Sequence, residues 1–366
     1  MRRLKLTVVV AALLLVSAGL PAAFAQDVTT ITAYGEVFNS RISPDGRLLA
    51  TFEDATYHGE VHSFLLPIRV YDLERGAGIE AFDGQTDYAR DVAFSPDGRL
   101  LAALYPVGWI DLWEIETGER IRQLPVAPDG GGMQWIPGTQ SVAVVAARPL
   151  QIQIWDTETG HMTRLMMERP DTFEALREQQ MGVPDGPAAL RVSPDGSEIA
   201  VATLYGRVIV WDVATGEPNV IYDPGLGQPS VPMTVLQYSA DGQRLYTLDR
   251  GTESLLALDA GTGEIVMQIA AEKFTQRPLA ISPDGRRAAW LSISNSAIES
   301  IQIADLDTGE IAEIPSPLAE DTRVLVPLAG LYFDASGDRL YLTGAVADPA
   351  SAIPYDNAIY VLELPQ

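Results

Sequence analysis

Hydrophobic and polar positions alternate in a unit that recurs seven times along the chain. Each unit holds a short apolar run, a tight polar turn, a second apolar run, and a third run that closes on an acidic residue. In the second unit these are residues 91–94, 95–98, 99–105 and 109–113. A nearly continuous apolar run such as 99–105 predicts a strand that is covered on both faces.

The polar turns have the sequence Ser-Pro-Asp-Gly or a variant of it. Proline presets φ, aspartate bonds the backbone that follows it, and glycine adopts a positive φ without steric cost. The four clean copies end at Gly46, Gly98, Gly196 and Gly285, and the altered copies end at Gly138, Gly242 and Gly337. Successive turn glycines lie about 40 to 60 residues apart, a period typical of propellers with four-stranded blades.

The seventh unit reaches Glu363 with three residues left, so it lacks an outer strand of its own. Residues 28–34 precede the first complete unit and are rich in β-branched side chains, which favour strands. We expect this segment to be the fourth strand of the last blade and to close the ring of blades. Closure covers the edges that an open stack of blades would expose. The sequence therefore predicts an all-β fold: a seven-bladed β-propeller, four antiparallel strands per blade, closed by the N-terminal strand.

The third run of two units ends on a Trp-Asp pair, Trp155-Asp156 and Trp211-Asp212. Together with the Ser-Pro-Asp-Gly turns, these pairs resemble the bacterial WD-repeat and related quinoprotein-like seven-bladed propellers, over residues 28–364. The chain departs from the eukaryotic WD-repeat pattern because no Gly-His pair precedes each inner strand; its only histidines are His58, His62 and His161. The resemblance therefore implies the fold and does not carry partners over to this chain.

The first 25 residues have the pattern of a targeting segment. A basic start at residues 2–5 precedes an apolar stretch at 6–20 and small residues at 23–25. We expect a Sec-type signal peptide over residues 1–25, cleaved after Ala25, and one propeller domain over 26–366 in the periplasm or secreted. The alternative is an uncleaved membrane anchor, but the apolar stretch is shorter than the roughly 20 residues that a spanning helix needs.

Composition narrows the classes of partner. With 25 basic and 49 acidic residues, the formal net charge is −24, and such a surface repels nucleic-acid phosphates and anionic membranes. We therefore expect no nucleic-acid partner and no membrane insertion once the signal is removed. The chain contains no cysteine, which excludes disulfides and thiolate metal sites. We expect a monomer that binds another protein.

Function is expected at the end of the blades opposite the uniform turns, because variable loops on a rigid scaffold commonly carry it. The long connections there are 53–67, 167–188 and 344–357, and the first and last should lie on neighbouring blades. Within the middle one, a capping box beginning at Asp171 predicts a short helix that ends near Gly182. The candidate partner-binding residues are Tyr57, His58, His62, Trp109, Phe173, Arg177, Tyr355 and Asp356.

Catalytic and metal motifs are missing from the sequence. It contains no Gly-x-Ser-x-Gly elbow, P-loop or dinucleotide fingerprint. His58 and His62 form the only cluster with metal-like residue types, and we interpret it as a surface hairpin loop. We therefore expect no catalytic, cofactor or metal residues, and predict an exported, non-enzymatic scaffold. Two alternatives stay open: a lactonase- or quinoprotein-like small-molecule enzyme with its site at the channel mouth, and a structural envelope protein without a discrete ligand.

Overall fold

The computed structural model describes residues 28–33, 37–53, 56–58, 63–65, 68–82, 89–128, 130–147, 149–167, 185–223, 235–249, 252–271, 274–294, 297–317, 324–347 and 354–364. These residues form strands and turns without any helix, as predicted. Within them there is accordingly no helix long and apolar enough to cross a membrane. The predicted signal peptide and the predicted helix at 171–182 lie outside the described residues.

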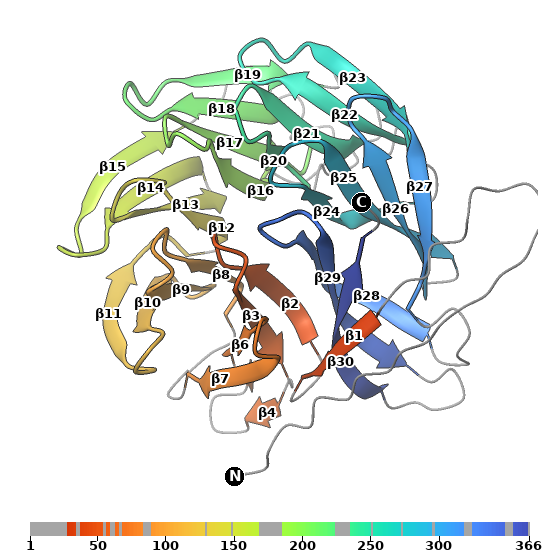
Figure 1. Ribbon diagram of the computed structural model, residues 1–366. Coiled ribbons are helices and arrows are strands. Elements are labelled where there is room, and N and C mark those ends of the chain that lie inside the picture. The colour runs from red at the N-terminus through yellow and green to blue at the C-terminus, as the bar shows by residue number, and fades with distance from the viewer. Residues whose placement is uncertain are drawn as a thin grey trace, which may run out of the picture. The chain divides into compact units, whose positions relative to one another are not determined.

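The strands form seven four-stranded antiparallel sheets and one two-stranded ladder (Figure 1). The chain divides into two compact units, Met1–Thr86 with Lys273–Gln366, and Asp87–Glu272. We number the sheets as blades in chain order. Blades 6, 7 and 1 belong to the first unit and blades 2 to 5 belong to the second.

In the first unit, blade 1 consists of β2 (Val37–Ile42), β3 (Leu48–Glu53), β6 (Ile68–Asp72) and β7 (Ala77–Ala81). The ladder β4 (Thr56–His58) and β5 (Ser63–Leu65) lies between β3 and β6 in the sequence. Blade 6 consists of β24 (Phe274–Ile281), β25 (Arg287–Ser294), β26 (Ala297–Asp305) and β27 (Ile311–Pro315). Blade 7 consists of β28 (Val324–Phe333), β29 (Arg339–Ala347), β30 (Pro354–Glu363) and β1 (Val28–Thr32).

In the second unit, blade 2 consists of β8 (Asp91–Phe94), β9 (Leu100–Tyr105), β10 (Trp109–Glu114) and β11 (Arg120–Pro125). Blade 3 consists of β12 (Gly130–Trp135), β13 (Ser141–Ala147), β14 (Leu150–Asp156) and β15 (Met162–Met167). Blade 4 consists of β16 (Pro187–Val192), β17 (Glu198–Thr203), β18 (Val208–Asp212) and β19 (Pro218–Tyr222). Blade 5 consists of β20 (Gln237–Tyr238), β21 (Arg244–Asp249), β22 (Ser254–Asp259) and β23 (Ile265–Ala270).

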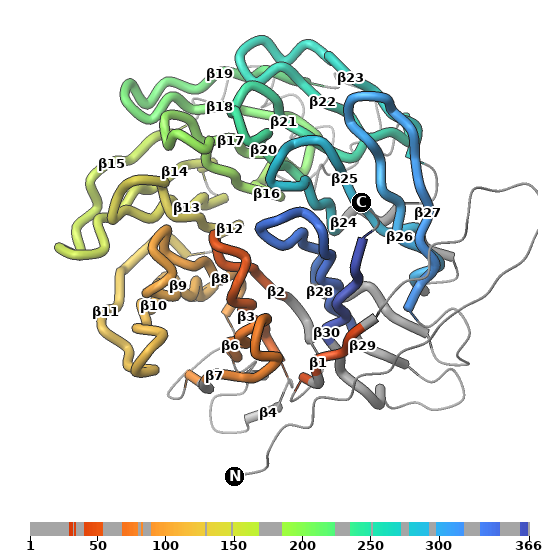
Figure 2. Tube along the Cα trace, viewed as in Figure 1, coloured from red at the N-terminus to blue at the C-terminus, as the bar shows by residue number. Residues whose placement is uncertain are grey.

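The N-terminal strand completes blade 7, as the sequence predicts. β1 pairs antiparallel with β30, with Val28 opposite Leu362 and Ile31 opposite Ile359. The two strands lie side by side in Figure 2 although they come from opposite ends of the chain. The pairing gives β30 a neighbour on both sides and makes β1 the edge strand of this blade.

The hydrophobic core lies between consecutive blades, because the two middle strands of a blade are covered on both faces. All six residues of β3 are buried, whereas only one residue of the outer strand β11 is buried. Within each unit, the described core clusters draw side chains from two consecutive blades, such as Leu112 of blade 2 with Val144 of blade 3. Burying one such aliphatic side chain contributes about 1.5–3 kcal/mol to folding.

Tryptophans at the end of the third strand belong to this core. Trp113, Trp155 and Trp211 occupy the same position in β10, β14 and β18, and all three are buried. Trp155 packs with residues of blade 2 and Trp211 with residues of blade 3, which confirms the sequence-based interpretation of these two as packing residues between blades.

Candidate functional site

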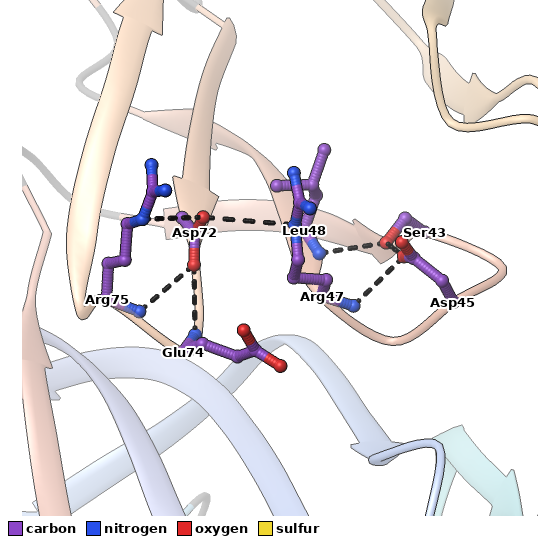
Figure 3. A network of polar contacts seen from close by, with 7 residues as sticks. All are labelled: Ser43, Asp45, Arg47, Leu48, Asp72, Glu74 and Arg75. Atoms are coloured by element: carbon purple, nitrogen blue, oxygen red, sulfur yellow. Dashed lines mark hydrogen bonds and ion pairs between the residues drawn. The ribbon is translucent and has the colours of Figure 1, made fainter.

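At one end of each blade, which we call the turn end, polar side chains close the first hairpin turn. In blade 1 the hydroxyl of Ser43 donates to Asp45 Oδ1 and accepts the N–H of Leu48 at 2.8 Å (Figure 3). Asp45 Oδ1 also accepts the N–H of Arg47 at 3.1 Å. Gly46 adopts a φ of 72°, the left-handed conformation that the turn requires. Every group of the repeated motif therefore serves the turn itself.

The second hairpin of the blade ends beside the first one. Asp72 Oδ1 accepts the N–H groups of Glu74 and Arg75, at 3.1 and 3.0 Å. Asp72 Oδ2 lies 3.8 Å from Arg47 Nε and 3.7 Å from Arg75 Nε, so the acid that closes the third strand links both turns (Figure 3). Asp45 and Asp72 thus stabilise the hairpin turns of their own blade.

These hydrogen bonds stabilise the ionised carboxylates. The hydroxyl of Ser193, followed by the N–H and hydroxyl of Ser197, lowers the pKa of Asp195 to about 2. The hydroxyl of Ser95 likewise lowers the pKa of Asp97 below its usual range. These carboxylates are thus ionised at neutral pH.

The opposite end, which we call the loop end, differs from blade to blade. In blade 1 the connection from β3 to β6 contains an extra ladder in which Tyr57 pairs with Phe64 and His58 with Ser63. The backbone thus places two candidate residues, Tyr57 and His58, in a hairpin, as interpreted from the sequence. The ladder itself was not predicted, because each of its strands has only three residues.

A buried carboxylate lies at the start of this connection. Glu53 is the last residue of β3 and is fully buried. Its Oε1 accepts the hydroxyls of Thr51 and Tyr71, both at 2.6 Å. A buried acid with two hydroxyl donors fixes the point at which the long connection leaves blade 1.

Blade 7 extends farther at its loop end than the sequence indicates. The loop was expected to begin at Gly344, but β29 and β30 remain paired up to Ala347 and Pro354. The other two candidate residues of this unit, Tyr355 and Asp356, therefore belong to β30 and not to a loop; Asp356 pairs with Val346. The strands stay paired through residues 345–347 and 354–357, with one irregularity between Val346 and Ala347, and a search for turn motifs does not detect this pairing.

Blades 1 and 7 are neighbours, as predicted. The Ser40 hydroxyl lies 2.9 Å from the Thr343 hydroxyl, and the Tyr332 hydroxyl donates to the Ser40 carbonyl. At the turn end, a β-carbon on Gly46 would lie 2.9 Å from the backbone nitrogen of Ala335. Since the turn ends of the two blades coincide, the β4–β5 connection and the β29–β30 hairpin leave their blades at the same end.

Trp109 is the candidate residue whose side chain the structure describes. It begins β10 after the turn at residues 106–108, and it is half-buried. Its ring lies 5.9 Å from the ring of Tyr105 at an interplanar angle of 41°. The neighbouring Val107 is 52% exposed, so this tight turn presents apolar surface at the loop end of blade 2.

An ion pair at the loop end of blade 4 was missed by the sequence reasoning. Arg207 Nη2 lies 2.8 Å from Asp185 Oδ2, and the two side chains are 4% and 6% exposed. Asp185 Oδ1 accepts the N–H groups of Tyr205 and Gly186, at 2.9 and 3.0 Å. The pair fastens the entry to β16 onto the β17–β18 turn, and no sequence spacing indicates it because the partners lie 22 residues apart.

The remaining candidates, His62, Phe173 and Arg177, lie outside the described residues. Of the eight candidate residues, the structure thus places five on strands: four in the first unit, in β4 and β30, and Trp109 in blade 2. The described part of the chain contains no group of three His, Cys, Asp or Glu side chains that could hold a metal ion.

Comparison with known proteins gives distant relatives of this chain. No family model matches. The human angio-associated migratory cell protein is 23% identical over 210 residues, which are 57% of this chain and 44% of that protein. The zebrafish GATOR2 complex protein WDR24 is 26% identical over 101 residues, 27% of this chain and 13% of its own length. The mouse periodic tryptophan protein 2 homolog is 23% identical over 276 residues, 72% of this chain and 27% of its own length.

The chain therefore spans less than half the length of the curated relatives it matches. Among solved structures, the β-propeller domain of Cps50 (Swd1) from Myceliophteria thermophila matches with a TM-score of 0.69 at 15% identity, over 92% of this chain and 100% of that one. This match and the seven four-stranded sheets confirm the predicted fold class, a seven-bladed β-propeller. The relatives support the WD-repeat part of the resemblance; the bacterial and quinoprotein-like parts stay predictions.

Proposed function

We propose that this WD-repeat-like, seven-bladed propeller is an exported, non-enzymatic scaffold that binds a protein partner through the loop end of its blades. The observation that carries the proposal is the difference between the two blade ends. At the turn end the Ser-Asp pair recurs with the same hydrogen bonds, as in Ser95–Asp97 and Ser193–Asp195. At the loop end, blade 1 adds a ladder and blade 7 lengthens its hairpin.

Rigid blades with differing loops suit recognition of a protein surface. The strands are held by cores between blades, so the loop ends have a stable base. Exposed apolar side chains also occur there, with Val107 52% and Leu204 41% exposed. Among the relatives, WDR24 is named as a protein of the GATOR2 complex, which supports a role in protein assembly for this chain.

Site-specific crosslinking tests the choice of end. A photoreactive amino acid replaces Tyr57, Trp109 or Tyr355 at the loop end, and Glu116 or Glu264 at the turn end as matched exposed controls. We expect the loop-end positions to crosslink to one shared partner in the cell envelope, and the control positions to give none. Crosslinks to that partner from Glu116 or Glu264 alone would show that the wrong end was chosen.

Export is tested by cell fractionation. The proposal expects the mature protein to begin after Ala25 and to be found in the periplasm or the medium. Replacing residues 2–5 with neutral residues should retain the full-length chain in the cytoplasm. An unprocessed chain in the membrane fraction would support the anchor alternative.

A further inference from the structure

The outer strand of blade 7, β1, has a free edge. It pairs with β30 along one side, and among the described residues no backbone hydrogen bond reaches its other side. In an antiparallel ladder the N–H and C=O groups of every second residue point to the same side of the strand. The free side of β1 therefore presents backbone donors and acceptors on which another strand can pair.

The other six outer strands carry features that hinder such pairing. Charged side chains, proline and β-bulges are the usual ones. A charged residue lies in each of β7, β11, β15 and β27, and a proline lies in β11, β19 and β27. β23 has neither, but its pairing with β22 is irregular between Ala257 and Leu258. Each of these edges is therefore hindered in at least one way.

β1 has none of these features. Its sequence is Val-Thr-Thr-Ile-Thr, without charge or proline, and its register with β30 is regular over all five pairs. All five residues are β-branched, a class that favours strands. Of the seven outer strands that the structure describes, β1 is thus the one whose edge is uncharged, regular and free of proline.

The strand is fixed in place by its contacts within the first unit. Ile31 is 2% exposed and belongs to a core cluster with Leu49 and Tyr71 of blade 1 and Ile359 of β30. Burial of this side chain sets the register of β1, because a slip by one residue would turn Ile31 to the opposite face. A second strand would therefore meet an edge that is already ordered.

The composition of β1 favours a second copy of this chain as the occupant of the edge. Two β1 strands that pair antiparallel about Thr30 overlap over their full length, with Thr30 opposite Thr30 and Thr29 opposite Ile31. Directly opposite threonines favour such a ladder, and no like charges face each other because β1 contains no charge. A charged segment of another protein would find no opposite charge on β1. Since each copy has one such edge, the symmetric contact closes at two chains.

We propose that this protein forms a two-fold symmetric dimer in which the β1 strands of two copies pair antiparallel and join their blades 7 into one continuous sheet. This differs from the monomer expected from the sequence, because ring closure leaves β1 itself as an edge. The net charge of −24 on each copy opposes association, and salt screens this repulsion. Dimerisation should therefore strengthen as salt is added.

Sedimentation velocity of the purified chain over a range of concentrations tests the dimer. We expect the mass to rise from one chain to two, at lower concentration when salt is added. Thr30→Lys and Thr30→Glu each place like charges opposite one another at the two-fold centre. Either variant alone should associate about fivefold more weakly, because such a pair changes the stability of a ladder by up to about 1 kcal/mol. An equimolar mixture should associate again, because lysine then faces glutamate.

Thr163→Lys is the matched control. Thr163 is an exposed threonine of the outer strand β15, which already contains Arg164, so dimerisation should be unchanged in this variant. Thr30→Lys makes the net charge less negative, so its weaker association cannot come from overall repulsion. A parent chain that stays monomeric, even if another protein pairs with β1, would overturn the proposal. Equal losses in Thr30→Lys and Thr163→Lys, or no recovery in the mixture, would do the same. None of these results bears on crosslinking at the loop end.

Discussion

Removing the positive charge of Arg207 should destabilise the protein far more than removing a surface charge. In Arg207→Met the Asp185 carboxylate keeps its two backbone N–H donors but loses Arg207 Nε at 2.9 Å and Nη2 at 2.8 Å. Because the two side chains are only 4% and 6% exposed, water does not replace these donors. Breaking a buried pair in this way costs about 3–5 kcal/mol of unfolding free energy.

The chain offers a control with nearly the same geometry and a different environment. Arg339 Nε lies 2.7 Å from Glu363 Oε1, but these side chains are 46% and 48% exposed. Solvent screens an exposed pair, so Glu363→Gln should cost about 0–1 kcal/mol. The comparison separates burial from distance as the cause of the effect.

Urea denaturation at pH 7, followed by circular dichroism and tryptophan fluorescence, measures both variants. We expect the transition of Arg207→Met at clearly lower urea than that of Glu363→Gln. Adding Asp185→Asn to Arg207→Met should recover part of the loss, because it removes the uncompensated charge. Equal losses for the two single variants, or no recovery in the double variant, would refute the reasoning.

Three further predictions follow from other contacts. The pKa of Asp195 is lowered to about 2, so its ionised form stabilises the fold above the unfolded pKa of 3.8. After solvent screening, Asp195→Asn should cost up to about 1 kcal/mol at pH 7, and this difference should shrink as the pH falls from 4 towards 2 in urea titrations. Gly263→Ala places a β-carbon 1.7 Å from the Ile221 carbonyl oxygen of the preceding blade, whereas Gly118→Ala meets no atom of the described residues within 4 Å; both glycines have a positive φ. Thermal melts should show a larger loss for Gly263→Ala than the roughly 1–2 kcal/mol of left-handed strain in Gly118→Ala. Tyr71→Phe removes a hydroxyl donor from buried Glu53 and should cost about 1–3 kcal/mol, measured by the urea midpoint.

Specific results would contradict each of these. A stability difference between Asp195→Asn and the parent that persists unchanged at pH 2 would show that the carboxylate is not the stabilising group. Equal melting temperatures for the two alanine variants would mean that the turn of Gly263 moves freely. An unchanged midpoint in Tyr71→Phe would mean that Glu53 has sufficient donors without this hydroxyl.

Turns and strands were readable from the sequence because their causes are local. A serine two residues before an aspartate, followed by glycine, closes a turn by itself, as Ser95 and Asp97 do. The third-strand pattern likewise located β10, β14 and β18, and the unmatched segment at the N-terminus predicted the pairing of Val28 with Leu362.

The candidate functional region was less predictable because its contacts join residues that are distant in the sequence. The sequence indicated which connections are long, but not that β29 and β30 stay paired to Ala347. It also did not indicate the ion pair between Arg207 and Asp185 or the hydrogen bond from Tyr71 to Glu53. Neither pair has a sequence spacing that is specific to such a contact.

By itself the sequence determined the fold class, the number of blades and the closing strand, since hydrophobic period and turn chemistry act over a few residues. Only the tertiary structure decided where the repeat fails to repeat. Gly160 and Gly216 hold the same turn position with φ values of 77° and 78°, yet a β-carbon on Gly160 would lie 2.9 Å from Arg122 Nη1, and one on Gly216 would lie 3.4 Å from Met166 Cγ. The reason is physical: the space beside a turn depends on the side chains of the adjacent blade, which a linear pattern does not contain.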